Sequence, residues 1–350
     1  MIPSKILLTN NIKSAIADFF SEKSFSKIGI IVDENTKELC LPKIITAINQ
    51  KKYCIIETKS GEENKNIDSC ILAWKKLTDC KFDRNSLVIN LGGGIICDMG
   101  GFIASTFKRG IEFINIPTTL LSQVDASIGG KIGIDFMQYK NQLGLFKEAS
   151  KTIISTEFLK TLNKREIKSG FSEIFKHSLI KDSKYFDEII KNNWNYQNWD
   201  HHIKKSIEIK SKIVTKDPEE LGLRKILNFG HTIGHGVEST FLNTKNKLLH
   251  GEAISVGIIC ESFISKNRSG LKEIELNKIN KYILDNYSFE KIHHHNINKI
   301  INNIVQDKKN IDEIIRMTLL KKIGSSTYDI SVTKKEIEES VLYFNNLLNK

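Results

Sequence analysis

Short apolar runs alternate with longer amphipathic segments in the first half of the chain, and this rhythm constrains the fold more than any other feature. The runs at residues 27–33, 53–57, 86–91 and 112–117 have the length and β-branched content of buried strands. An amphipathic segment, residues 65–78, separates the second run from the third. Because strands that alternate with helices are typical of βαβ units, we expect an α/β region built on a parallel sheet.

The apolar period becomes helical after about residue 155. It continues through residues 164–181, 198–216, 225–240, 251–267 and 270–285. A short β-like return at residues 315–323 and 326–332 precedes a last helix over residues 334–349. Because 350 residues are many for one core, we expect two domains, residues 1–160 and a mainly helical domain at residues 161–350.

Composition excludes several classes of protein. No window holds the roughly 18 uninterrupted apolar residues of a membrane span, and the first residues lack the pattern of a signal peptide. The six cysteines are scattered without a C-x-x-C pair, which is typical of reduced thiols. We therefore expect a cytoplasmic protein that does not bind membranes.

The net charge of +11 permits an anionic partner. Lysines are spread over the whole length, and no arginine-rich or aromatic-interleaved basic block occurs. This distribution disfavours nucleic-acid binding and leaves an anionic small substrate open.

Three of the nine histidines lie between Arg224 and Glu252. His231 and His235 stand four residues apart in an amphipathic run, so a helix would project both from one face, and His250 follows a short polar segment. Converging imidazoles are typical of a zinc site. A helix with two half-buried histidines and an unrelated third one fits the spacing equally well.

Two glycine-containing stretches suggest anion binding. Residues 91–101, LGGGIICDMGG, directly follow a strand, where glycines let backbone amides approach a phosphate. They do not form the G-x-G-x-x-G fingerprint, so a tight strand-to-helix turn remains the alternative. Residues 117–135 carry Asp125 on a helix-like run and Lys131 after two glycines, with Lys140 and Asn141 beyond. This group suits a phosphorylated or carboxylated ligand, and a solvated loop explains it nearly as well.

Further charged residues recur at helical spacing. Glu173 and Lys176 would share one helix face, either as a surface ion pair or, if Glu173 is buried, with that residue as a third zinc ligand. Lys210 and Arg224 flank a segment in which Pro218 favours a helix end or a turn.

Taken together, these motifs resemble the 3-dehydroquinate synthase family of sugar-phosphate cyclases. They occur in the same order, at residues 33–35, 61–65, 92–110, 116–131, 140–141, 170–177, 222–235, 249–253 and 307–309. Several motifs at consistent intervals are far more specific than any one of them.

The resemblance implies an N-terminal Rossmann-like domain that binds NAD, a mainly α-helical C-terminal domain that binds zinc or cobalt, and a homodimer. Matching positions assign the metal to Glu173, His231 and His250. They assign the cofactor to Asp33, Asn35, Glu62, Lys65, Gly93, Gly94, Asp98, Thr118, Thr119, Asp125, Lys131 and Lys140. They assign the substrate to Lys131, Asn141, Lys176, Lys210, Arg224, Asn228, His235 and Lys308, and to Arg109, which in the family reaches the partner subunit's site.

The implied reaction converts 3-deoxy-D-arabino-heptulosonate 7-phosphate to 3-dehydroquinate and phosphate, in the shikimate pathway of aromatic amino acid biosynthesis. It proceeds by transient oxidation with NAD, phosphate elimination, reduction and intramolecular aldol closure. The substrate carries a carboxylate and a phosphate, and the assigned lysines and arginines suit both groups.

Four features depart from the family pattern, one of them residues 146–150, FKEAS, which replace a typical F-x-x-P ending. Cys97 and Tyr139 stand where glycine is frequent, and Ile132 replaces a common threonine. A positive φ at residue 97 would disfavour cysteine more than glycine, so these positions put the local loop conformation in question.

Three other functions remain. A related cyclase would act on sedoheptulose 7-phosphate or glucose 6-phosphate with the same cofactors. A metal-dependent alcohol dehydrogenase would release NADH, and a binding protein would turn nothing over. The retained Lys131, Asn141, Lys210 and Arg224, together with the DKK segment at residues 307–309, favour the carboxylated substrate.

Overall fold

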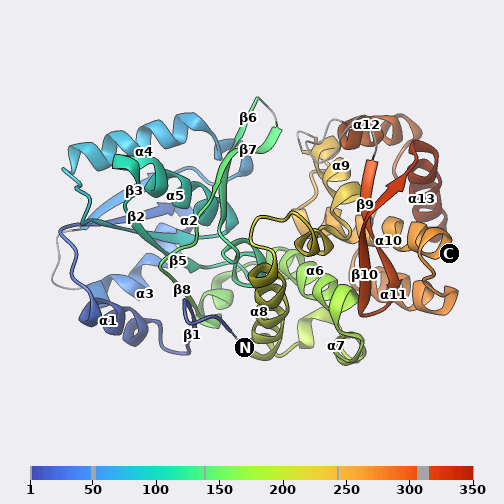
Figure 1. Ribbon diagram of the computed structural model, residues 1–350, viewed down its shortest axis with the longest axis horizontal. Helices are drawn as coiled ribbons and strands as arrows, with labels where there is room; N and C mark the ends of the chain where they lie inside the picture. Colours follow the sequence, from blue (N-terminus) through green and yellow to red (C-terminus); the bar gives the residue numbers. More distant parts are fainter. Residues whose placement is uncertain (1, 49–52, 138, 243, 306–314, 350) are drawn as a thin grey trace. The chain divides into compact units, whose positions relative to one another are not determined.

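The computed structural model describes residues 2–48, 53–137, 139–242, 244–305 and 315–349 (Figure 1). The chain folds into two compact units. Unit 1 comprises Met1–Ile167 and Trp199–Ser211, and unit 2 comprises Lys168–Asn198 and Lys212–Lys350. The domain boundary expected after residue 160 stays a prediction.

Unit 1 is built on a six-stranded sheet in which every neighbouring pair is parallel. Its order is β1 (Ile6–Leu8), β8 (Lys151–Ile154), β5 (Glu112–Pro117), β4 (Leu87–Gly92), β2 (Ile28–Asp33) and β3 (Tyr53–Thr58). The four strands expected from the sequence are confirmed as β2, β3, β4 and β5. The sequence did not reveal β1 and β8, which have only 3 and 4 residues.

Helices cover both faces of this sheet, as Figure 1 shows for α1 (Ile12–Glu22), α3 (Leu41–Ile45), α4 (Ile67–Asp79) and α5 (Gly94–Thr106). Ile30 and Val32 pack in one core cluster with α1 and α3, whereas Ile31 packs in the other with α4 and α5. Because successive strand residues point to opposite faces, a sheet covered twice needs continuous apolar strands. This explains the unbroken apolar runs of the sequence.

The strand order reverses beside β2. The chain leaves β2 towards the edge strand β3, and then returns through α4 to β4 on the other side of β2. Ligands of open α/β sheets bind at such a switch point, beyond the carboxyl ends of the strands. Asp33 ends β2 and Gly92 ends β4, so Asp33 and the glycine segment that follows Gly92, both expected to bind the cofactor, lie at the carboxyl ends of these strands.

Two further parts of unit 1 follow β5 in the chain. Asp125 lies in a short π-helical turn, Ser122–Ala126, which corresponds to the helix-like run of the sequence. An antiparallel hairpin, β6 (Lys131–Phe136) and β7 (Tyr139–Phe146), then carries the GGK and KN segments. The sequence did not predict this hairpin.

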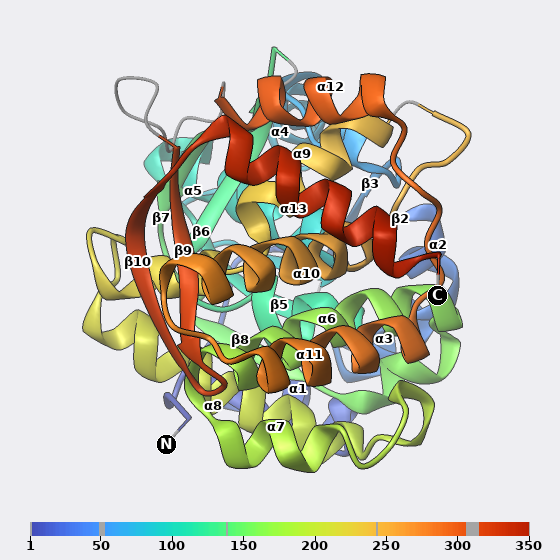
Figure 2. The ribbon, with the colours of Figure 1, turned by 90° about the vertical axis from the view of Figure 1, so that its right-hand side faces the viewer.

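Unit 2 is mainly helical. It contains α6 (Lys164–Lys181, from Lys168), α7 (Ser183–Ile189), the end of α8 (Trp199–Lys216), α9 (His231–Phe241), α10 (His250–Arg268), α11 (Glu273–Asn286), α12 (His294–Val305), α13 (Lys334–Leu347) and the hairpin β9 (Ile315–Lys322) and β10 (Ser325–Val332). Figure 2 shows α10 between α13 and α11, and α9 and β9 also pack on it. Its residues 253–262 are buried on every side, which identifies α10 as the core helix of this unit.

The helix expected over residues 225–240 is wrong over residues 225–230. Leu223–Asn228 forms a 3-10 turn, Phe229 leaves the helical conformation, and Gly230 has a φ of 79°, so α9 begins only at His231. Ile226, Leu227 and Phe229 are buried through this irregular segment, and their apolar pattern therefore imitated a continuous helix.

The expectation of six reduced cysteines is wrong for one pair. Cys54 on β3 and Cys80 after α4 form a disulfide with Cα atoms 6.7 Å apart. The two residues meet because α4 packs along β3. A cytoplasmic location stays a prediction.

Among the described residues, no helix has both the length and the apolar content that crossing a bilayer requires.

Candidate functional site

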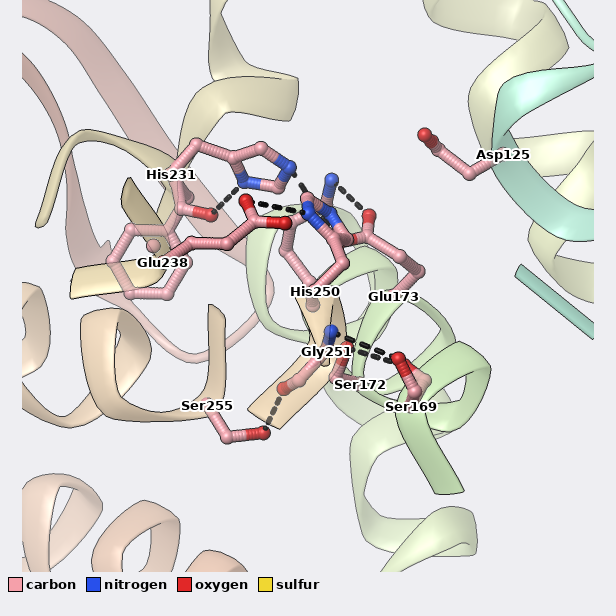
Figure 3. A network of polar contacts seen from close by, with 12 residues as sticks. Asp125, Ser169, Ser172, Glu173, His231, Glu238, His250, Gly251 and Ser255 are labelled. Carbon is pink, nitrogen blue, oxygen red and sulfur yellow. Dashed lines mark hydrogen bonds and ion pairs between the residues drawn. The ribbon is translucent and has the colours of Figure 1, made fainter. Parts of the chain in front are cut away.

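Three histidines converge in unit 2, and Figure 3 shows two of them, His231 and His250. His231 is the first residue of α9, His235 follows one turn later, and His250 is the first residue of α10. Their ring centroids are 5.1, 5.5 and 5.8 Å apart, and each offers a nitrogen within 4.8 Å of the others. The convergence expected from the sequence is therefore present.

Glu173 of α6 completes this cluster. Its Oε1 lies 3.5 Å from His231 Nε2 and 3.6 Å from His250 Nε2, and the residue is 0% exposed. Two imidazole nitrogens and a buried carboxylate that face one point are the donor set of a zinc site with an open position. Burial lowers the pKa of His250, but the carboxylates of Glu238 and Glu173 outweigh burial and raise it to about 10. The cluster therefore attracts a positive charge, and its residues fit a divalent metal ion.

Lys176 lies one helical turn after Glu173, and its Nζ pairs with Glu173 Oε2. Both side chains are fully buried, so the interpretation of this pair as a surface ion pair is wrong. Burying such a charge pair costs desolvation free energy, and removing either partner leaves the other as an uncompensated buried charge.

Gly251 explains how α6 and α10 bring Glu173 and His250 together. A Cβ atom on Gly251 would lie 1.9 Å from the carbonyl oxygen of Ser169 on α6. The Gly251 N–H donates to Ser169 Oγ at 2.9 Å, as Figure 3 shows. Only glycine permits this approach. The next residue, Glu252, caps α10 by accepting from the Leu249 N–H at 2.8 Å.

Arg224 is held in a turn that Asp217 organises. The carboxylate of Asp217 accepts backbone N–H bonds from Leu221, Gly222 and Arg224 at 2.9, 2.8 and 2.8 Å. The Arg224 guanidinium donates to the Pro218 carbonyl, and the residue is 2% exposed. The turn expected at Pro218 is confirmed, whereas sequence reasoning missed Asp217.

Asn228 lies at the end of the same segment. Its Nδ2 donates to Glu220 Oε1 at 2.6 Å, which fixes the orientation of the amide. Glu220 is a second residue that sequence reasoning missed, because an acidic residue in a polar turn gives no specific signal.

Unit 1 gathers several of the expected cofactor residues around Lys65. Lys65 Nζ lies 2.7 Å from Asp98 Oδ2 and 2.6 Å from Asn141 Oδ1, and Lys140 Nζ lies 3.5 Å from Glu62 Oε1. Burial lowers the pKa of Lys65, but Asp98 and Glu62 outweigh burial and raise it above its ordinary value. Lys65 is therefore a buried group whose acidic neighbours favour its ammonium form.

Asp135 fixes the loop that carries Asn141. Asn141 has a φ of 50°, and its N–H donates to Asp135 Oδ1 at 2.7 Å, while the Asp135 N–H donates to the Lys65 carbonyl at 2.8 Å. Asp135 thus ties Lys65 to Asn141 through the backbone. It was not among the residues expected from the sequence.

Lys210 pairs with Asp125 within unit 1. Its Nζ lies 2.6 Å from Asp125 Oδ1 and 2.7 Å from the Asp125 carbonyl oxygen. A residue expected to contact substrate is thus joined to one expected to contact the cofactor.

The glycine segment after β4 forms a strand-to-helix turn. Gly93 is the N-cap of α5 and Gly94 its first residue, and no described side chain caps this end. Uncapped N–H groups at a helix start favour an anion. Cys97 lies inside α5 in helical backbone, with Sγ 3.8 Å from the Gly92 carbonyl, so cysteine introduces no φ strain there.

The other expected residues have varied surroundings. Asp33 caps α2 (Glu34–Leu39) by accepting from the Thr36 N–H at 2.8 Å. Three of the expected residues are exposed to solvent: Asn35, Lys131 and Arg109. Arg109 has a φ of 68°. Thr118 is buried, and Thr119 Oγ1 lies 2.9 Å from Ser122 Oγ. Lys308 lies outside the described residues.

Comparison with known proteins places the chain among similar sequences over most of its length. The family described as 3-dehydroquinate synthase N-terminal matches residues 55–169, and the one described as 3-dehydroquinate synthase C-terminal matches residues 170–310. The chain is 38% identical over 347 residues to a 3-dehydroquinate synthase of Parabacteroides distasonis, covering 98% of each. It is 39% identical over 346 residues to that of Pelagibacter ubique, covering 95% of this chain and 93% of the relative.

Solved structures show the same fold. The structure of ValA, a 2-epi-5-epi-valiolone synthase from Streptomyces hygroscopicus with NAD⁺ and Zn²⁺ bound, has a TM-score of 0.87 at 24% identity and covers 100% of this chain and 98% of its own. Glycerol dehydrogenase from Schizosaccharomyces pombe has a TM-score of 0.68 at 12% identity, covering 100% and 90%. At these identities the likeness concerns the fold alone.

Proposed function

The chain belongs to the 3-dehydroquinate synthase family, and on that premise we propose that it converts 3-deoxy-D-arabino-heptulosonate 7-phosphate to 3-dehydroquinate and phosphate. The observation that carries the proposal is the convergence of Glu173, His231 and His250 in a chain that is similar to a 3-dehydroquinate synthase over 98% of its length.

Glu173, His231 and His250 would hold the metal ion, zinc or cobalt. A bound metal ion would supply the Lewis acidity that lowers the pKa of a substrate hydroxyl, and bound NAD would supply a reversible hydride acceptor. His231 Nδ1 lies 3.1 Å from the Phe229 carbonyl, which can only accept, so Nδ1 donates and Nε2 carries the lone pair of the neutral ring. This tautomer suits a ligand. His235 would remain beside the metal and contact substrate.

Unit 1 would hold NAD beyond the carboxyl ends of β2 and β4. Gly93 and Gly94 would place the N–H groups of α5 against the pyrophosphate, since the start of a helix favours negative charge. The cluster around Lys65 would order the hairpin residues Lys140 and Asn141.

Cationic residues would bind the two acidic groups of the substrate. Arg224 suits bidentate contact with a carboxylate or phosphate, because its guanidinium is planar and held by the turn at Asp217. Lys176 and Lys210 are buried ammonium groups whose partners, Glu173 and Asp125, fix their positions. Such fixed cations bind and orient a flexible anion, which aldol closure requires.

The functional form would be a homodimer in which Arg109 reaches the partner subunit. The β6–β7 hairpin supports an association surface, because Met137 is 75% and Phe146 58% exposed. Large apolar side chains of this exposure favour burial against another copy of the chain.

One assay tests the proposed reaction. The purified protein, with NAD⁺ and Zn²⁺, would be given the heptulosonate phosphate, sedoheptulose 7-phosphate or glucose 6-phosphate, while phosphate release and net NADH are followed. We expect phosphate from the heptulosonate alone and no accumulation of NADH. Turnover of either other sugar phosphate would identify a related cyclase, and accumulated NADH would identify a dehydrogenase.

A further inference from the structure

Glu238 lies against His250 on the side opposite to Glu173. Its Oε2 is 3.4 Å from His250 Nδ1, whereas His250 Nε2 is 3.6 Å from Glu173 Oε1. Figure 3 shows the imidazole between the two carboxylates. Glu238 is 7% exposed, so its charge is held inside the unit rather than in solvent.

The place of Glu238 on α9 follows from helical periodicity. His231, His235 and Glu238 stand at the first, fifth and eighth positions of the helix, which project from one face. One helix face therefore carries a metal ligand, a second histidine and the carboxylate that meets His250 of α10.

The two histidine ligands are oriented in the same way. His231 directs Nδ1 to the Phe229 carbonyl at 3.1 Å, and His250 directs Nδ1 to Glu238. A carbonyl oxygen and a carboxylate both accept hydrogen bonds, so each ring donates through Nδ1 and presents Nε2. Histidine ligands of metal sites commonly have such an acceptor behind them.

We propose that Glu238 is a positioning residue of the metal centre, which fixes the rotation and tautomer of His250 and strengthens it as a ligand. The inference rests on the proposed metal site. The hydrogen bond removes the alternative tautomer, in which Nδ1 would carry the lone pair and Nε2 the proton. The negative charge of the Glu238 carboxylate also makes the His250 imidazole a stronger donor of its Nε2 lone pair to a cation.

The competing role for Glu238 is purely structural. A buried carboxylate can stabilise the packing of α9 and α10 without affecting the metal. The two roles differ in what they change: a structural role alters the free energy of unfolding, whereas a positioning role alters metal affinity and ligand geometry in the folded protein.

The test compares Glu238→Ala, Glu238→Gln and Glu275→Gln in the full chain. Glu275 is a matched control, because its carboxylate also accepts hydrogen bonds, but from the backbone N–H groups of Ile323 at 2.9 Å and Lys272 at 3.2 Å rather than from a proposed ligand. The Kd for Zn²⁺ would be measured by competition with a chelator, the visible absorption of the Co²⁺-substituted protein would be recorded, and thermal unfolding would be followed without metal.

We expect Glu238→Ala to weaken Zn²⁺ binding by about 10- to 100-fold and to change the Co²⁺ spectrum. Glu238→Gln should lose less Zn²⁺ affinity than Glu238→Ala, because its amide oxygen still accepts a hydrogen bond from His250 Nδ1. Glu275→Gln should bind Zn²⁺ with the affinity of the wild type. Zn²⁺ affinity and Co²⁺ spectra unchanged in Glu238→Ala would overturn the proposal, even if the variant unfolds at a lower temperature.

A His250→Ala variant separates this inference from the proposed function. If His250→Ala loses Zn²⁺ and Glu238→Ala keeps it, the metal site stands and the role of Glu238 fails. If His250→Ala retains stoichiometric Zn²⁺, the ligand assignment fails, and the inference fails with it.

Discussion

Gly251 of α10 lies so close to Ser169 of α6 that a Cβ atom would stand 1.9 Å from the Ser169 carbonyl oxygen. This contact lies next to His250 on one helix and one turn before Glu173 on the other. The distance between two proposed metal ligands is therefore set by the absence of one side chain.

Gly251→Ala should force α10 away from α6. We expect a loss of about 1–3 kcal/mol in the free energy of unfolding, as for overpacked cores, together with weaker Zn²⁺ binding, because His250 moves with the helix. Urea unfolding without metal and Zn²⁺ titration of the folded variant measure the two effects. A variant with wild-type stability and affinity would contradict the close approach.

Glu261 of α10 caps the N-terminus of α9. Its carboxylate accepts from the N–H groups of Gly230 at 2.6 Å and Ile233 at 3.0 Å, and it is 0% exposed. Glu261→Gln should lower the free energy of unfolding by about 1.5–3 kcal/mol, because one backbone donor then faces an amide NH₂. Urea unfolding measures the loss.

Glu273→Gln is the matched control for Glu261→Gln. Glu273 pairs with Lys266 at the surface and its side chain is 61% exposed, so its removal should change stability by less than about 1 kcal/mol. Equal losses in the two variants would show that Glu261 does not cap α9.

The sequence predicted the residues of the proposed metal centre, but not the residues that hold them in place. Glu173, His231 and His250 belong to motifs whose order is specific, and the structure brings them together. Glu238, Glu261 and Asp217 gave no signal, because their partners are backbone groups or side chains that only the fold brings near.

The same limit applies to the fold. Long apolar runs predicted β2, β3, β4 and β5, whereas β1 and β8 have too few residues to show a period. The start of α9 was misplaced because Gly230 breaks the helix inside a continuous apolar pattern. Local conformation at a single glycine decides such a boundary.

Asp217 should make the turn that holds Arg224 sensitive to acid. Burial raises the pKa of Asp217, but N–H bonds from Arg224, Gly222 and Leu221 outweigh it, so the folded pKa lies below the ordinary 3.8. A group with a lowered pKa stabilises the fold fully above its unfolded pKa and loses that contribution as the pH falls through the folded pKa. Asp217→Ala should therefore be less stable than wild type by about 1–3 kcal/mol near neutral pH.

The difference in the free energy of unfolding between Asp217→Ala and wild type should become smaller below about pH 4. At that pH the Asp217 carboxyl of the unfolded wild type takes up its proton. Urea unfolding at several pH values measures it. Asp285→Ala, which removes an exposed partner of Lys281, should give a small difference at every pH. If the difference in the free energy of unfolding between Asp217→Ala and wild type grows as the pH falls, the predicted pH dependence is wrong.

The number of cysteines that react with a thiol reagent tests the disulfide between Cys54 and Cys80. Cys54 and Cys80 are bonded, and the other four of the six are buried. Burial raises the pKa of Cys40 to about 11 and that of Cys70 to about 12, and it also raises the pKa values of Cys97 and Cys260. Because the thiolate is the reactive form, these four should react with a thiol reagent near pH 8 only after unfolding.

Denatured protein that has not been reduced should therefore show four reactive thiols, and reduced protein all six. Cys54→Ser frees Cys80 and should show five without reduction, which makes it the matched control. Six thiols in unreduced, denatured wild type would show that the bond between β3 and α4 does not form in solution. Rapid labelling of the native protein would instead show that the buried thiols open to solvent.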